Sequence, residues 1–403
     1  MRIAHYAPDL WSNGGVATYV RRLATEQTTR GHEALLLSQV APPANLSDLV
    51  GPTGPATYVS VPDATRVYDV AQAHCSDIVH LHKPVPERPP TELPTLRTMH
   101  DNTAACPSGT RYLARTGTPC PRIASLPACL WGHAVDGCGS RHPKRLQHNF
   151  QRMASEQRVL SGMPVVAVSN YIRQEMIRAG YDADTITVVP SPAPTRPSPL
   201  PPSSAAVPHF LFMGRVVPEK GLEWLLRALA TVDVQIHLDV AGDGYELDEA
   251  RSLSTELGLD DRVTFHGWVA PSDITPLLAK ARAVVVPSLW HEPAGLVTLE
   301  AAAAGRPVIA SRVGGIPEYA HPSFSLLVAP NDVSGLASHL TRLASDASLA
   351  AEMGRTGHSC AQERFGMNQF VENMDSVYSN VIASASGPEE TSDHSAPSTL
   401  SFT

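Results

Sequence analysis

The chain opens with a pattern of apolar and polar positions that predicts a strand, a loop and a helix. Met1–Tyr6 predicts a short strand, and the turn-forming residues from Pro8 to Gly15 predict a loop. Apolar residues then recur at helical spacing, namely Val16, Tyr19, Val20 and Leu23. Ala34–Leu37 is apolar throughout, which predicts a strand buried on both faces of a parallel sheet.

The same reading predicts alternating strands and helices along the rest of the chain. In the first half, the expected strands are Asp77–Leu81, Thr95–Met99 and Val165–Val168, and the expected helix is Tyr171–Ala179. In the second half, the expected strands are Phe210–Met213, Ile236–Ala241, Val263–His266, Ala283–Val286 and Val308–Ala310, and the expected helices include Leu222–Ala230 and Gly295–Ala304. Such alternation predicts a doubly wound parallel sheet, whose ligands bind at the carboxyl ends of the strands.

The length of 403 residues is too great for one ordinary core, so we expect two α/β, Rossmann-like domains facing each other across a cleft. Eight prolines between positions 190 and 208 exclude regular structure there and indicate a linker. The expected parts are a first domain at 1–189 with a Cys-containing insert at 102–148, the linker at 190–208, a second domain at 209–365, a C-terminal helix at 366–385 packing back on the first domain, and a disordered tail at 386–403.

The distribution of charge argues against a nucleic-acid-binding protein. The first 200 residues hold 19 Lys and Arg against 15 Asp and Glu, whereas the remainder holds 12 against 24. One basic cluster contains Arg141, Lys144, Arg145, Arg152 and Arg158. It is either a solvated helix face or a surface that contacts an anionic acceptor or a membrane.

No apolar run approaches the length of a membrane span, and the first residues do not resemble a signal peptide. We therefore expect a cytoplasmic protein, with peripheral contact to the inner membrane face as an option. In a reducing compartment, the six cysteines do not indicate a disulfide framework.

Four features lie at predicted strand ends of the second domain. Gly214-Arg215 is followed by Lys220, Val240–Gly244 is rich in glycine, Pro287–Glu300 joins a strand to a helix, and Gly314–Glu318 forms another glycine turn. A guanidinium and an ammonium group at the first spacing can both face a diphosphate. The helix start near Gly295 exposes backbone N–H groups that can bind an anion.

Two carboxylates flank that helix start. Glu292 lies in the loop before the helix and Glu300 lies within it, with seven residues between them. Carboxylates accept hydrogen bonds from sugar hydroxyls, so this spacing suits a molecule with a sugar at each end of a diphosphate. Because Leu296, Val297 and Leu299 and the alanines at 301–304 make the helix apolar nearly all round, we expect Glu300 to be buried.

Taken together, the order Gly-Arg…Lys-Gly, Ala-Gly-Asp-Gly, the Glu pair and Gly-Gly-Ile-Pro-Glu resembles the retaining glycosyltransferases of family 4, which have the GT-B fold. The resemblance covers about 207–380 and extends more loosely through the first half. It implies transfer of a hexosyl-type sugar from a nucleoside-diphosphate sugar to an unidentified polysaccharide, lipid or small-molecule acceptor, with retention of anomeric configuration. It also implies that no metal cofactor is required for catalysis.

The resemblance implies roles residue by residue. Arg215 and Lys220 would hold the diphosphate, Glu292 would contact the transferred sugar, and Glu300 the ribose. Gly214 and Gly295 belong to the same turns, and Leu296 and Val297 would offer backbone N–H groups to phosphate. In the first domain, Gly14 and Gly15 match the glycine pair that approaches the diphosphate, and His100 matches the position that faces the donor sugar. For His80 and His82 we favour a structural role.

The segment after His100 departs from the family pattern. Cys106, Cys120, Cys129 and Cys138 lie within 33 residues, at gaps of 14, 9 and 9. These are not the close pairs of a standard zinc site, yet a loop without an obvious core needs something to fix it. A structural zinc ion, free thiols and a disulfide pair all remain open. The position of the insert suggests that it shapes the acceptor pocket.

Three other functions fit parts of the pattern. A nucleotide-sugar epimerase of the same fold would isomerise its substrate without an acceptor. A non-catalytic nucleotide-sugar-binding protein would not need Arg215, Lys220, Glu292 and Glu300 together. An NAD-dependent enzyme is disfavoured because the loop at Gly14-Gly15 lacks the Gly-x-Gly-x-x-Gly fingerprint.

Overall fold

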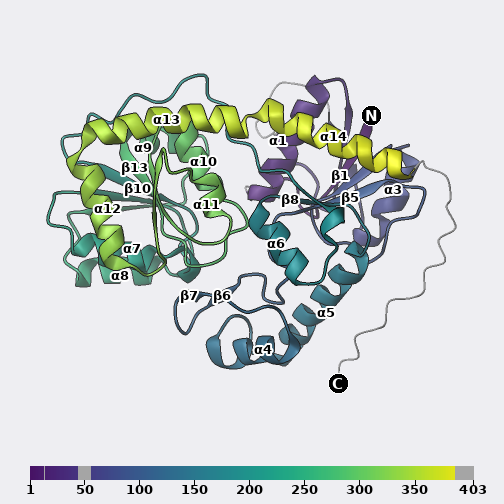
Figure 1. The fold of residues 1–403 in the computed structure, drawn as a ribbon, viewed down its shortest axis with the longest axis horizontal. Coiled ribbons are helices and arrows are strands. Elements are labelled where there is room, and N and C mark those ends of the chain that lie inside the picture. Colours follow the sequence, from purple (N-terminus) through teal and green to yellow (C-terminus); the bar gives the residue numbers. More distant parts are fainter. Residues whose placement is uncertain (13, 44–55, 386–403) are drawn as a thin grey trace.

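A computed structural model describes residues 1–12, 14–43 and 56–385 and shows two α/β domains side by side (Figure 1). This confirms the predicted fold class. The expected disordered tail at 386–403 lies outside the described residues.

The first domain is built on a parallel sheet of seven strands within the described residues, in the order β3-β2-β1-β4-β5-β8-β9. The strands are β1 Arg2–Tyr6, β2 Glu33–Ser38, β3 Thr57–Ser60, β4 Ile78–Leu81, β5 Thr95–Met99, β8 Val165–Ala167 and β9 Ile186–Val188. In the centre, Ala4 lies beside Leu35 and Val79. Strand order reverses next to β1, so the loops after β1 and β4 open the crevice where ligands of such sheets bind.

Successive residues of β1 enter different hydrophobic cores, as the period of a strand requires. Ala4 and Tyr6 pack with helices α3 (Val67–Ala73) and α6 (Asn170–Arg178). Ile3 packs on the other face with α1 (Gly15–Thr29) and α14 (Met367–Ala385). Both faces of the sheet are therefore covered, which explains why β2 is apolar from Ala34 to Leu37 and why all four residues of β4 are buried.

The second domain repeats this plan with a parallel sheet in the order β12-β11-β10-β13-β14-β15, as far as the structure describes the chain. The strands are β10 His209–Met213, β11 His237–Ala241, β12 Val263–Gly267, β13 Ala281–Val286, β14 Val308–Ser311 and β15 Ser325–Val328. One face packs against α7 Leu222–Ala230, α8 Leu247–Glu256 and α12 Val333–Ser345. The other packs against α9 Ile274–Lys280, α10 Leu296–Ala303, α11 Ile316–Tyr319 and α13 Ala347–Phe365.

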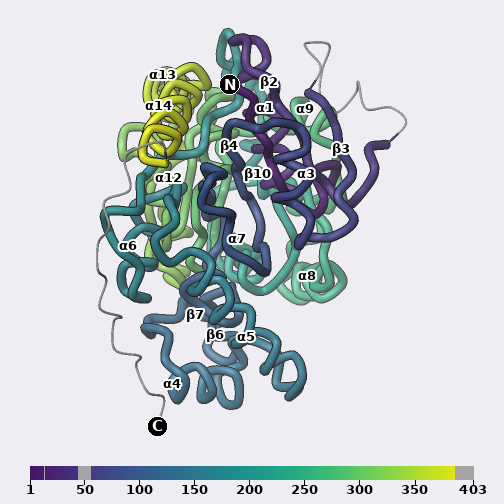
Figure 2. The backbone as a smooth tube through the Cα atoms, turned by 90° about the vertical axis from the view of Figure 1, so that its right-hand side faces the viewer, coloured from purple at the N-terminus to yellow at the C-terminus, as the bar shows by residue number. Residues whose placement is uncertain are grey.

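The C-terminal helices connect the two domains. Helix α13 belongs to the second domain, the backbone is extended at Gly366, and α14 then runs along the first domain (Figures 1 and 2). Phe370 and Met374 of α14 are buried in the same core as Tyr19 of α1. The polypeptide therefore crosses between the domains at 190–208 and again at Gly366.

The Cys-containing insert projects from the first domain at the lower end of the molecule (Figures 1 and 2). It contains the short antiparallel strands β6 Tyr112–Leu113 and β7 Thr118–Pro119, helix α4 Leu126–Trp131, a π-helical turn at Gly132–Asp136 and the start of α5 Pro143–Leu160. Tyr112 is buried in the core of the second domain, and Asn331 of that domain donates a hydrogen bond to the carbonyl of Gly117 at 2.7 Å. The insert therefore contacts both domains.

We predict that Tyr378→Phe lowers the free energy of unfolding by about 1–3 kcal/mol, because it leaves two buried polar groups without a partner. The Tyr378 hydroxyl lies 2.8 Å from His80 Nδ1 and accepts from Gln27 Nε2 at 3.2 Å. Urea denaturation provides the measurement. The matched control is Tyr58→Phe, whose hydroxyl makes one exposed hydrogen bond to the Val40 carbonyl and whose loss should change stability little. Equal effects of the two substitutions would contradict this interpretation.

Candidate functional site

The cationic pair of the second domain lies where two glycine-rich strand ends pack against each other. A side chain on Gly242 would collide with the Gly214 carbonyl, and one on Gly244 would collide with the Val216 carbonyl. The backbone after β10 is held there by the hydrogen bond from Val216 N to Asp243 O at 2.9 Å. The glycines after β11 thus allow a close approach of backbones that fixes the position of Arg215.

Arg215 and Lys220 face different partners. The Arg215 side chain is 66% exposed and lies 3.6 Å from Glu219. Lys220 donates to Glu292 Oε1 at 2.7 Å and lies over the ring of Trp290. Two of the predicted site residues are thereby brought into direct contact, and Arg215 remains accessible.

The loop containing Glu292 is held by three consecutive backbone carbonyls. The carbonyl of His291 accepts from Asn102 Nδ2 at 2.9 Å, and that of Pro293 accepts from Ser169 Oγ at 2.6 Å. Between them, the Glu292 carbonyl accepts from the backbone N–H of Gly315 at 2.7 Å. The first domain supplies two of these donors and the glycine turn after β14 supplies the third.

Glu292 itself is buried, and its carboxylate also accepts a hydrogen bond from the hydroxyl of Ser288. Gly314 has a φ of 57°, and a side chain there would collide with the Glu292 backbone. The Gly-Gly turn therefore serves close packing behind Glu292, and L residues with side chains cannot replace Gly314 without strain.

Helix α10 begins at Leu296, directly after this loop, and its first turn exposes N–H groups that have no acceptor within the helix. Gly15 of the first domain faces this turn, because a Cβ on Gly15 would lie 3.5 Å from Leu296 Cδ1. Gly14 is the N-cap of α1. The structure thus places the predicted glycine pair of one domain opposite the predicted anion-binding helix start of the other.

The expectation that Glu300 is buried is wrong. Its neighbours Leu299 and Ala301 are fully buried, whereas the Glu300 side chain is exposed. It lies on the side of α10 turned toward the first domain, where it senses the charge of Arg22. The surrounding protein reduces its hydration and raises the pKa of its carboxyl group, and Arg22 opposes that rise.

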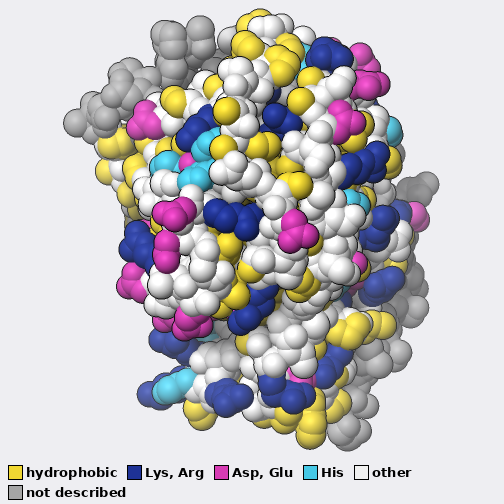
Figure 3. Space-filling view, turned by 90° about the vertical axis from the view of Figure 1, so that its left-hand side faces the viewer, with side chains coloured by type: hydrophobic (Ala, Val, Ile, Leu, Met, Phe, Trp, Pro, Cys, Tyr) yellow, Lys and Arg dark blue, Asp and Glu magenta, His cyan; other side chains and the backbone are white. Residues whose placement is uncertain are grey.

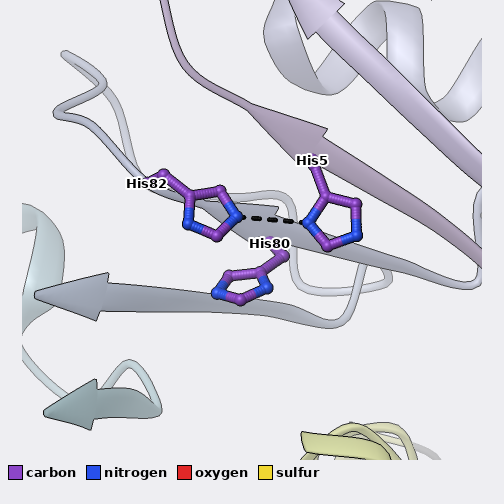
Figure 4. Close-up of side chains that lie close together, drawn as sticks. All are labelled: His5, His80 and His82. Atoms are coloured by element: carbon purple, nitrogen blue, oxygen red, sulfur yellow. Dashed lines mark hydrogen bonds between the residues drawn. The ribbon is translucent and has the colours of Figure 1, made fainter. Parts of the chain in front are cut away.

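His100 follows β5 and is joined to a row of buried imidazoles in the first domain. His82 Nδ1 lies 3.1 Å from His100 Nε2, and His82 Nε2 lies 3.1 Å from His5 Nδ1 (Figure 4). His5 Nε2 in turn lies 2.7 Å from the Gln27 side-chain oxygen. His80 lies beside this row and is bonded instead to Tyr378 and Thr98.

The row fixes which nitrogen of His100 carries a proton. The Gln27 oxygen only accepts, so His5 must donate from Nε2 and accept at Nδ1. His82 then donates from Nε2, and His100 donates from Nε2 to His82. The free Nδ1 of His100 is therefore an acceptor, suited to a hydroxyl group of a ligand.

Burial keeps these histidines neutral. It lowers the pKa of His5 to about 4, and burial followed by the charge of Lys83 lowers the pKa of His100 to about 3. Burial also lowers the pKa of His80 and His82 well below the ordinary value. His100 thus offers a hydrogen bond and not a positive charge at neutral pH.

Several residues at the site were not predicted from the sequence. Asn102 and Ser169, which hold the Glu292 loop, are two of them. Glu318 belongs to a predicted motif, but its contact was not predicted: it accepts hydrogen bonds from the backbone N–H groups of Asn170 and Tyr171, each at 2.7 Å. The exposed rings of Tyr245 and Trp268 lie after β11 and β12, at the carboxyl edge of the second sheet. For Trp268, the sequence does contain a signal: an aromatic residue directly after the glycine that ends a strand, Gly267.

The four insert cysteines line a single cavity of about 20 Å³, and no disulfide joins any of the six cysteines, all of which lie in the described residues. A larger cavity of about 800 Å³ lies between the insert, α6 and the second domain. Arg111 and Cys120 of the insert, Tyr171 of α6 and His291 line it. The rings of Tyr171 and His291 are stacked with centroids 5.4 Å apart.

In the part of the chain that the structure describes, no helix combines the length and apolar character needed to cross a bilayer. Of the basic cluster, Arg152 donates to the Pro107 carbonyl and so supports the insert. The remaining members are exposed, namely Arg141, Lys144, Arg145 and Arg158.

Two family models match the chain and together cover most of it. Residues 13–196 match the model described as Glycosyltransferase Family 4, and residues 207–346 match the model described as Glycosyl transferases group 1. The boundary between the matches falls in the Pro-rich linker.

Curated relatives include the lipopolysaccharide core biosynthesis glycosyltransferase LpsD of Rhizobium meliloti, 38% identical over 42% of this chain and 51% of that protein. The D-inositol 3-phosphate glycosyltransferase of Corynebacterium glutamicum is 30% identical over 60% of this chain and 63% of that protein. The chain spans about half the length of the first of these relatives.

Solved structures share the fold over nearly the whole chain. HepE of Anabaena, in complex with UDP and glucose, superimposes with a TM-score of 0.69 at 21% identity, covering 94% of this chain and 100% of that one. A glycosyltransferase of Rickettsia africae gives a TM-score of 0.69 at 17% identity, covering 94% and 98%.

The depressed histidine pKa values predict a loss of stability in acid. Unfolded histidine titrates near 6.5, so as the pH falls from about 6.5 toward 4 the unfolded chain binds protons that the folded chain excludes. Between pH 7.5 and 5.0, each such histidine should lower the free energy of unfolding by about 2 kcal/mol.

Urea denaturation of the protein and of His5→Gln at these two pH values provides the test. The variant should lose less stability on acidification, because it lacks one histidine that binds a proton in the unfolded chain but not in the folded chain. His74→Gln, at an exposed position, is the control and should keep the original pH dependence. An unchanged pH dependence in His5→Gln would refute the assignment.

Proposed function

Since the chain belongs to glycosyltransferase family 4, we propose that it transfers a hexosyl sugar from a nucleoside-diphosphate sugar to an acceptor. One observation carries the proposal. The Lys220–Glu292 pair ties the turn after β10 to the loop before α10, Gly15 of the other domain lies opposite the start of that helix, and Arg215 is accessible in the same turn after β10. Cations, helix N–H groups and a side-chain-free backbone are what a diphosphate between two sugars requires.

In this proposal the diphosphate binds to Arg215, to Lys220 and to the N–H groups of Leu296 and Val297. Arg215 has only a partial partner in Glu219, so its guanidinium group can turn to an anion. Lys220 is neutralised by Glu292 before the donor binds. An incoming diphosphate would accept a hydrogen bond from the Lys220 ammonium group. One Glu292 oxygen would then be free to accept a hydrogen bond from a sugar hydroxyl.

The transferred sugar and the nucleoside of the donor would contact different residues. The transferred sugar would contact Glu292 and the Nδ1 acceptor of His100. The ribose would contact Glu300, whose exposed carboxylate lies less than three turns along the same helix. Trp268 and Tyr245 offer exposed rings on which a nucleobase can stack.

Reaction by this donor requires a nucleoside diphosphate to leave. The bond between the anomeric carbon and the phosphate oxygen breaks, and a bond from an acceptor hydroxyl oxygen to that carbon forms. With retention, the hydroxyl attacks on the face of the leaving group and passes its proton to the departing phosphate oxygen. Preorganised cations and N–H groups there stabilise the developing negative charge.

The acceptor would bind on the first-domain side, near His100 and the insert. The 800 Å³ cavity beside the insert is large enough for a sugar-sized group. Figure 3 shows Lys and Arg side chains gathered over the lower end of the molecule, where Figure 1 places the insert and α5. We include in the proposal a peripheral contact with an anionic membrane through the exposed basic residues of the region Arg141–Arg158.

We predict that a thermal-shift screen of UDP, GDP and ADP sugars identifies one stabilising nucleotide. At 100 times its Kd, the ligand should add about 2.7 kcal/mol to stability. Trp268→Ala should reduce this gain, because it removes a stacking surface. Absence of a shift with every nucleotide sugar tested would contradict the donor assignment.

With the donor identified, Arg215→Ala and Lys220→Ala should each lower turnover by about 100-fold or more, since both remove charge from the leaving group. Turnover is measured as sugar transfer or as slow donor hydrolysis. Arg227→Ala is the control, because Arg227 lies on the exposed side of α7 and pairs only with Glu223 within the described residues. Near-normal turnover in both site variants would refute the assignment.

The same assay separates the alternative reaction. Isomerised nucleotide sugar formed without any acceptor would identify an epimerase instead of a transferase. The anomeric configuration of a transferred product, read by NMR, tests retention.

A further inference from the structure

Four cysteines distant in sequence surround one small cavity in the insert. Cys106 precedes β6, Cys120 follows β7, Cys129 lies in α4, and Cys138 follows the π-helical turn. Each therefore comes from a different local segment. All four cysteines line this one cavity although no two of them are close neighbours in sequence.

Apolar burial does not explain how this segment is held. Helix α4 contains no buried residue, and Trp131 in it is 59% exposed. Ile123, Leu126 and Leu130 are exposed as well. A segment with so little core of its own usually depends on a cross-link or a bound metal.

One unpaired N–H group at the cavity suits ionised sulfur. Arg111 and Arg122 both line the cavity, where Arg111 also pairs with Glu175 and Arg122 with Asp136. Arg122 Nη1 and the Cys138 sulfur lie close to the same point above Gly132, and Nη1 is buried without a hydrogen-bond acceptor among the described residues. A thiolate would give that N–H group an acceptor.

Burial opposes ionisation of two of the four thiols, Cys129 and Cys138. Burial, and then the neighbouring Cys106 and Cys120, raise the pKa of Cys138 to about 12. Burial likewise raises the pKa of Cys129. A cation in the cavity reverses this balance, because a metal-bound thiol loses its proton outright.

We propose that Cys106, Cys120, Cys129 and Cys138 bind one zinc ion as four thiolates in a closed, structural site. Four sulfur ligands in tetrahedral geometry are what zinc prefers, and they leave no position open for catalysis. Each thiol releases its proton to solvent on binding, so the filled site carries two negative charges. Arg122 Nη1, which has no acceptor among the described residues, could then donate a hydrogen bond to one of the thiolates.

The cysteine site lies next to the part of the insert that contacts the second domain. The strands β6 and β7 of the insert lie directly before Cys120. In this segment, Tyr112 is buried in the core of the second domain, and Asn331 of that domain donates a hydrogen bond to the Gly117 carbonyl. His291, next to Glu292, lines the same cavity as Cys120 of the insert. Zinc would thus fix residues 112–120 of the insert, here called the strap, which contact both domains. That the strap lies beside a donor site rests on the proposed function.

Metal analysis of the purified chain tests the site independently of any activity. We expect about one equivalent of zinc per chain, released on thiol modification and detected with the chromogenic chelator 4-(2-pyridylazo)resorcinol. Cys129→Ser and Cys138→Ser should each retain less than about a fifth of an equivalent. Cys75→Ser, at an exposed position outside the insert, is the matched control and should keep full zinc.

Less than a tenth of an equivalent of any metal in the unmodified chain would overturn the proposal. So would iron with inorganic sulfide and visible absorption, or a mass lower by two hydrogens for each disulfide. If a variant fails to fold, zinc release from the unmodified chain still decides the matter.

The link to the cleft is tested by nucleotide binding. Removal of zinc from the folded chain should weaken binding of the stabilising nucleotide by about 10-fold, because the strap no longer holds the His291–Glu292 loop. Unchanged binding after complete zinc loss would overturn the link and leave the donor assignment intact. Failure of the proposed function would appear instead as absent nucleotide binding in the zinc-loaded chain.

Discussion

The geometry of the cleft depends on three consecutive carbonyl groups in the loop before α10. Those of His291, Glu292 and Pro293 are each bound by a donor from a different part of the chain. Two donors belong to the first domain, so the loop is shared between domains. With its backbone held on all sides, the loop presents the Glu292 carboxylate to Lys220 in one fixed position.

This constraint connects packing to chemistry. Carbonyl groups tied to the first domain orient the loop, and the loop directs both the Glu292 side chain and the start of α10. A diphosphate bound at that helix start would therefore be gripped by groups whose positions were set before it arrived. Preorganisation of this kind is the main means by which enzymes stabilise charge in a transition state.

In the first domain, the row of buried histidines orients a predicted site residue, His100. Gln27 orients His5, and the orientation passes through His82 to His100, whose Nδ1 is thereby left as an acceptor. Helix α14 closes this network through Tyr378, although it follows directly on a helix of the second domain. The crossing of α14 and the strap formed by the insert thus join the domains on two sides of the site.

The sequence alone determined the two parallel sheets, the linker and the motifs at the strand ends. Apolar runs such as Ala34–Leu37 and Ala283–Val286 are long and uniform enough to be recognised without tertiary contacts. Short edge strands such as β3 and β15 were not predicted, because their residues are only partly buried and their pattern is weak. The motif glycines were identified, since they mark positions where backbones approach closely.

Tertiary structure decided which of these residues meet. Pairing of Lys220 with Glu292, exposure of Glu300 and the row behind His100 all join residues distant in sequence, so no local pattern encodes them. Seven of the eight positions of the helix containing Glu300 are apolar or small, a pattern that predicts burial, yet Glu300 itself is exposed to solvent. Local propensity sets the elements, whereas contacts across long sequence separations set the site.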